Sequence, residues 1–154
     1  MVVSCPELHH PGGPRPAPGS QTARRHERMV AIVTGFCPDV EIVEPGVCAF
    51  GARGPARYFG GETALATRII AALAHPGIQV GVADGLFAAL LAARRQQHDP
   101  TDREDQVTVV PPGGTARFLA SQPVSVLADQ DLARLLGRLG LTTLGDFEIG
   151  RAHV

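Results

Sequence analysis

The sequence predicts an α+β fold in which helices and short strands alternate. Several segments repeat apolar residues with a helical period, and short runs rich in valine and isoleucine separate them. Pro45-Gly46 lies between two such runs and predicts a hairpin, because proline presets the first central φ of a turn and glycine accepts a positive φ at the second. The predicted order is α-β-β-α-β-α-β followed by small helices, an antiparallel hairpin plus crossover helices.

The first third of the chain is predicted to be irregular and then helical. Residues 1–21 are rich in proline and glycine and predict an irregular segment. Residues 22–36 carry a helical apolar stripe, and strands are expected at 40–43 and 47–50.

The middle of the chain predicts a helix, a strand and a second helix. Leu65, Ile69 and Leu73 share one face of a helix over 61–74, which His75-Pro76-Gly77 should end. A strand over 78–83 follows. Asp84 is the expected N-cap of a helix over 85–97, whose sheet-facing side chains would be the pairs Leu86 and Leu90, and Phe87 and Leu91.

The last third predicts one strand and short helices. After the polar loop 96–106, a strand is expected at 107–110 and short helices at 114–120 and 129–139. Asp129 should cap the second helix and Gly140 should end it.

Composition constrains function only weakly. The 154-residue chain has 44% apolar residues and contains arginine but no lysine. Its net charge is −1, so no strong positive field draws it to nucleic acid. Three cysteines form no disulfide or metal spacing, and Cys5 with His9 and His10 is at most half a zinc site. No signal peptide or long apolar run is present, so we expect a cytoplasmic protein with no membrane partner. We also expect no cofactor.

Four blocks of the sequence, in order, resemble the Y-family (translesion) DNA polymerases. They are VEIVEPGVCAFGARGPARYFGGE at 40–62, VGVADGLFAALLAARR at 80–95, VTVVPPGGTARFLASQPVSVL at 107–127 and LARLLGRLGLTTLGDF at 132–147. The first resembles the palm hairpin, and the last resembles the thumb pattern. The segment ARGPARYFGGE, residues 52–62, is similar in sequence to the ImuB-like branch of this family, which is catalytically inactive.

The resemblance places the family's catalytic carboxylates on residues that have none. The acidic pair of the hairpin falls on Gly46 and Val47, and the trailing aspartate falls on Gly51. Two-metal phosphoryl transfer needs carboxylates to hold Mg²⁺. The resemblance therefore implies no catalytic, cofactor-binding or metal residue in this chain.

The resemblance also implies a domain plan. Residues 22–112 would be a partial ferredoxin-like palm, and 113–148 the start of a truncated helical thumb; residues 1–21 would be the end of the fingers region, a linker or a frameshifted stretch. The family's first palm strand, with a further metal-binding aspartate, is expected upstream of Met1. Residues 149–154, IGRAHV, match one frame of a sequencing-library adapter and are expected to be an adapter-derived tail.

The implied function is that of an accessory factor in DNA-damage tolerance, in translesion synthesis and SOS mutagenesis. The implied partners are damaged or primer-template DNA, an error-prone DnaE-type polymerase, a RecA-like accessory protein and the sliding clamp, in the bacterial cytoplasm near the nucleoid. Contacts to the DNA backbone would come from the helix over 129–139, the glycine after it and the Thr-capped start of the next helix: Gly140, Thr142, Thr143, Arg134 and Arg138. Simple helix capping is the alternative role for the threonines.

Two other functions stay open. One is an active Y-family polymerase whose acids lie outside this sequence. The other is a small-molecule phosphate-binding α+β enzyme that uses the glycine-rich turns FGGE at 59–62 and PPGGT at 111–115, although neither turn has the lysine of a P-loop.

Overall fold

A computed structural model describes residues 1–8, 15–95 and 106–146 of the chain. The predicted adapter-derived tail and all but the last residue of the polar loop lie outside the described residues. The chain divides into two compact units, Met1–Val110 and Pro111–Val154, which are described separately below.

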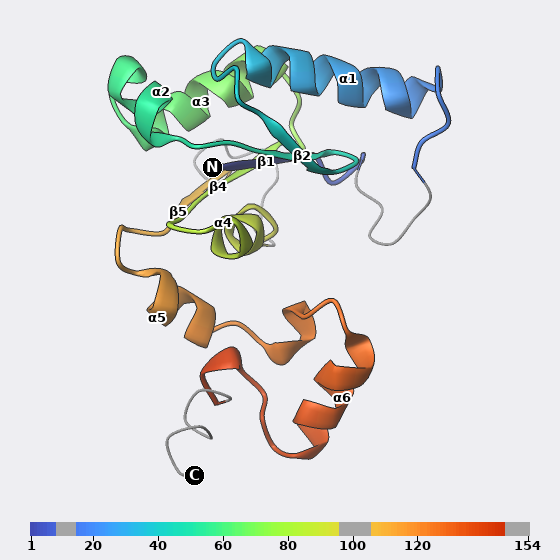
Figure 1. Cartoon of the computed structure of the whole chain (residues 1–154), viewed down its shortest axis with the longest axis vertical. Helices are drawn as coiled ribbons and strands as arrows, with labels where there is room; N and C mark the ends of the chain where they lie inside the picture. The colour runs from blue at the N-terminus through green and yellow to red at the C-terminus, as the bar shows by residue number, and fades with distance from the viewer. Residues whose placement is uncertain (9–14, 96–105, 147–154) are drawn as a thin grey trace. The chain divides into compact units, whose positions relative to one another are not determined.

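The first unit is built on a five-stranded sheet with the order β2-β3-β1-β4-β5 (Figure 1). Its elements along the chain are β1 (Val2–Ser4), α1 (Gln21–Thr34), β2 (Glu41–Glu44), β3 (Val47–Ala49), α2 (Arg53–Phe59), α3 (Glu62–Leu73), β4 (Gln79–Val82), α4 (Leu86–Ala93) and β5 (Val107–Val109). All neighbouring strands are antiparallel except β4 and β5, which are parallel. The predicted α+β class is therefore confirmed.

The first four strands form a β-α-β-β-α-β unit in which two helices, α2 and α3, make up the second connection. β1 lies between β3 and β4 and is antiparallel to both, while β2 and β3 form the predicted hairpin. This is the arrangement of a ferredoxin-like split βαβ unit. α4 and β5 then extend the sheet by one parallel crossover.

The central strand is the main correction to the sequence prediction. Residues 1–21 were expected to be irregular, yet Val2–Ser4 is a strand that lies between β3 and β4. The palm strand that the resemblance implies upstream of Met1 stays a prediction. All three residues are buried, because helices cover both faces of the sheet here. A strand that is buried on both faces shows no alternation of polar and apolar residues, so the local sequence of Val2–Ser4 did not identify it as a strand.

Two apolar clusters hold the layers together. α1, α2 and α3 cover one face of the sheet, and α4 covers the other (Figure 1). On the first face, Val3, Cys48 and Val80 pack against buried residues of α1 and α3, which include Met29 and Ile69. The predicted stripe on α3 is confirmed, with Leu65 and Ile69 fully buried and Leu73 partly buried at its end.

The second face is packed differently from the prediction. Leu86 and Phe87 are 48% and 42% exposed, so the prediction is wrong for these two, whereas Leu91 is buried and Leu90 is partly buried against the second cluster. The other buried residues of α4 are alanines. The cause lies in β4: a Cβ built on Gly81 would overlap the Ala89 carbonyl oxygen, so helix and strand approach too closely for large side chains. The N-cap of α4 is Gly85, not Asp84 as predicted.

The described part of the second unit, residues 111–146, includes α5 (Thr115–Ala120), the 3₁₀ helix η1 (Val124–Val126) and α6 (Gln130–Arg138). Asp129 caps α6 as predicted, since its carboxylate accepts from the amides of Asp131 and Leu132. Gly140, with φ of 81°, follows the end of α6 in the left-handed region.

Candidate functional site

Backbone pairing connects the hairpin turn to the end of β1, so Gly46 and Val47 lie beside the central strand. Ser4 of β1 is in register with Val47 of β3. The next amide, of Cys5, donates to the Gly46 carbonyl oxygen at 2.8 Å. The Gly46 amide in turn donates to Nδ1 of His26 on α1 at 3.1 Å. Hydrogen bonds therefore hold both the amide and the carbonyl group of Gly46.

Position 46 has no room for any side chain. A Cβ built on Gly46 would lie 2.8 Å from the Leu8 Cβ and 3.0 Å from the Cys5 carbonyl oxygen, and the φ of 79° already disfavours every residue but glycine. The carboxylate that the resemblance predicts for a catalytic hairpin at this position is therefore excluded by the local geometry. A glycine at this position is required by the turn.

Position 47 points into the core and away from solvent. Val47 is fully buried among Val2, Ala49, Ala89 and Ala93, beneath α4. A carboxylate in this apolar cluster would lose its hydration without gaining a partner. Gly51, the third position, is different: it is exposed, and a Cβ there would meet nothing within 4 Å.

Charged groups near the turn are already engaged. Glu44, at the end of β2, forms an ion pair with Arg94 at the end of α4. Within residues 1–8, 15–95 and 106–146, no three His, Cys, Asp or Glu side chains come together as a metal-binding group. Cys48, the cysteine next to Val47, is buried, and burial raises the pKa of its thiol to about 12.

The predicted DNA-contact residues form a self-capped turn in the second unit. The amides of Thr142 and Thr143 both donate to Oδ2 of Asp146, at 3.0 and 2.9 Å, and the Thr142 hydroxyl donates to the same oxygen at 3.1 Å. The Asp146 amide returns a bond to Oγ1 of Thr143. These bonds, chiefly those from the two backbone amides, lower the pKa of Asp146.

This geometry favours capping, the alternative role weighed for these threonines. A DNA phosphate could accept from the two amides only if the Asp146 carboxylate moved away. Arg134 and Arg138 lie on α6, and Arg134 pairs with Asp131 at 2.8 Å on the exposed surface. DNA contact by these five residues stays a prediction.

The two glycine-rich turns are placed before helices, as expected. Gly60 and Gly61, both at positive φ, line an open cavity of about 350 Å³ with Arg53 and Arg57 of α2. Glu62 lines the same cavity and opposes a phosphate there. In the second turn, the buried Thr115 hydroxyl finds no hydrogen-bond partner among the described residues, and the helix that follows is a short one.

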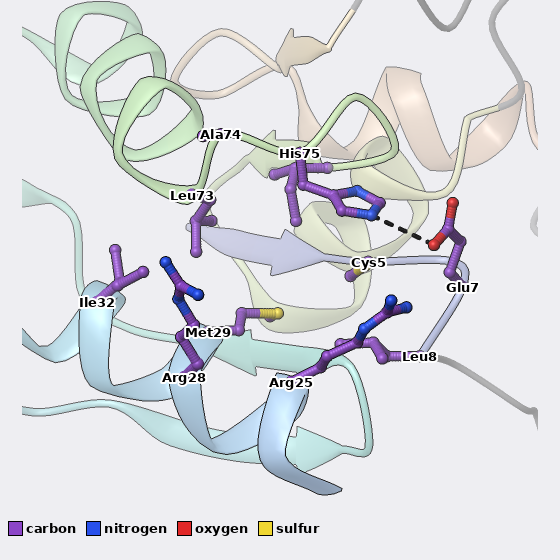
Figure 2. A pocket seen from close by; sticks show the side chains of 11 residues that line it. Cys5, Glu7, Leu8, Arg25, Arg28, Met29, Ile32, Leu73, Ala74 and His75 are labelled. Atoms are coloured by element: carbon purple, nitrogen blue, oxygen red, sulfur yellow. Dashed lines mark ion pairs between the residues drawn. The ribbon is translucent and has the colours of Figure 1, made fainter. Parts of the chain in front are cut away.

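Sequence reasoning missed one feature, a groove between α1 and the end of α3 (Figure 2). Its volume is about 300 Å³, and its lining comes from three separate stretches of the chain: Cys5, Glu7, Leu8, Arg25, Arg28, Met29, Ile32, Leu73, Ala74, His75 and Ile78. Cys5, proposed as half of a zinc site, is buried in this lining, and burial raises the pKa of its thiol. His9 and His10 lie outside the described residues. No sequence motif could have signalled a groove whose parts are so far apart along the chain.

Comparison with protein-family models, with curated proteins and with solved structures found no match. In the part of the chain that the structure describes, no helix has both the length and the apolar character needed to cross a bilayer.

Proposed function

We propose that this chain is a non-catalytic homologue of the Y-family DNA polymerases and acts as an accessory factor in DNA-damage tolerance. One observation carries the proposal: the two hairpin positions that would hold the catalytic acids are adapted to other roles. Gly46 occupies a left-handed turn with no space for a side chain, and Val47 is buried beneath α4. Two-metal catalysis needs accessible carboxylates at such positions.

Two further features support the proposal. The β-α-β-β-α-β topology agrees with the palm that the sequence resembles. Glu44, two residues before Gly46, already forms an ion pair with Arg94. The role would then be that of a scaffold in the bacterial cytoplasm, which binds damaged or primer-template DNA and a DnaE-type polymerase, a RecA-like protein and the sliding clamp.

Primer extension and metal titration test the absence of catalysis. With a primed template, nucleotides and Mg²⁺ or Mn²⁺, we expect no extension. In a Mn²⁺ titration, we expect no paramagnetic broadening localised to the amides of Ser4, Gly46 and Val47. Nucleotide incorporation, or saturable broadening at this turn, would instead support the active-polymerase alternative.

Binding experiments test the accessory role. The chain alone should bind DNA only in the non-specific range, about 10⁻⁴ M at physiological salt, because its net charge is −1. Arg134→Ala and Arg138→Ala should weaken that binding, while Arg117→Ala on α5 serves as a matched control. Biolayer interferometry against the three partner proteins completes the test. If neither DNA nor any of the three binds saturably, the accessory role is wrong.

A further inference from the structure

The groove between α1 and α3 combines an apolar floor with a positively charged rim. Leu8, Met29, Ile32, Leu73 and Ile78 supply the apolar surface. Its volume of about 300 Å³ lies at the small end of the range for ligand pockets, and the mixture of apolar lining with a few polar groups is typical of them.

The two arginines of the rim have no acid to neutralise them. Arg25 and Arg28 are one turn apart on α1, and Figure 2 shows their side chains on either side of Met29, with Arg28 toward Leu73 and Arg25 toward Leu8. Neither forms an ion pair with any acid in the described part of the chain. Either guanidinium could bind a carboxylate, since the planar donor fork of arginine matches carboxylate geometry.

The one carboxylate in the lining is engaged on the opposite side of the groove. Glu7 accepts from Nε2 of His75 at 3.2 Å, while Nδ1 of the same ring accepts from the Gly77 amide. With this histidine neutral, the lining carries two positive charges and one negative charge. The rim thus has an excess of one positive charge, which suits a monoanion better than a cation or a neutral molecule.

We propose that this groove is a binding site for a small amphipathic carboxylate. An aliphatic or aromatic tail would lie on the apolar floor, and the carboxylate would accept hydrogen bonds from one of the two arginines and be attracted by the charge of the other. The inference does not depend on the proposed function, because the groove shares no residue with the hairpin positions or with the second unit.

Octanoate is a suitable probe, with octanamide and acetate as the two controls. In two-dimensional ¹H–¹⁵N NMR, octanoate should give saturable shifts at the amides of Cys5, Leu8, Met29, Leu73 and Ala74. The expected dissociation constant is on the order of 1 mM for a ligand of this size. Octanamide lacks the charge and acetate lacks the tail, so each should bind at least about tenfold more weakly.

Arginine variants separate the groove from general electrostatic attraction. Arg25→Ala and Arg28→Ala should both weaken octanoate binding, one of them about tenfold, while Arg24→Ala, on the same helix but outside the lining, should leave it unchanged. All three side chains are exposed, so the fold should tolerate each change. The proposal is overturned if octanoate gives no saturable shifts, if octanamide binds equally well, or if the three variants behave alike.

Discussion

Replacing Gly46 by alanine should destabilise the first unit strongly, because two independent costs coincide at this residue. A side chain at φ of 79° lies in the left-handed region, which costs about 1–2 kcal/mol for an ordinary L-residue. The new Cβ would also lie 2.8 Å from the Leu8 Cβ and 2.9 Å from the Leu8 carbonyl carbon. Relieving such crowding typically costs about 1–3 kcal/mol.

The expected loss in the free energy of unfolding is therefore about 2–5 kcal/mol. This is a large share of the roughly 5–15 kcal/mol that holds an ordinary domain folded. Gly51→Ala is the matched control at another of the three motif positions: its φ is not positive, and its Cβ would meet nothing within 4 Å. That variant should be unchanged or more stable by up to about 1 kcal/mol, because alanine restricts the unfolded chain.

Urea denaturation provides the measurement. Circular dichroism follows the whole chain, and the NMR intensities of the Val3 and Cys48 amides follow the first unit alone, which avoids assuming a single transition for both units. A difference between Gly46→Ala and Gly51→Ala below about 0.5 kcal/mol would show that the turn relaxes freely. The geometric case against a carboxylate at position 46 would then fail.

Two further predictions concern titratable groups. Because burial raises the pKa of Cys48 to about 12, its thiol should resist iodoacetamide at pH 8 in the folded protein and react once urea exposes it; rapid labelling without unfolding would contradict the packing described around β3. The pKa of Asp146 is lowered from 3.8 by the Thr142 and Thr143 hydrogen bonds, so its stabilisation of the turn should be present above pH 3.8 and be lost as the pH falls through the lowered value. The amide shifts of Thr142 and Thr143 should follow that titration, and Asp146→Ala should abolish it; a titration at or above 3.8 in the unmodified chain would refute the capping geometry.

Local signals in the sequence determined most of the individual elements. The hairpin at Pro45-Gly46, the buried stripe of α3 and the Asp129 cap of α6 each depend on residues close together in the chain. Turn chemistry, helical periodicity and capping act over a few residues, so they can be read without knowing the fold. The sequence also determined the absence of acids at the three hairpin positions.

Only the tertiary structure decided the role of residues with weak or misleading local signals. Val2–Ser4 is a central strand because both of its faces are covered, and α4 packs through alanines because Gly81 lets the helix approach. Likewise, Gly46 leaves no room for a side chain only because Leu8 and Cys5 fold back against it. Such constraints arise between segments that are distant in sequence, and no local pattern of residues encodes them.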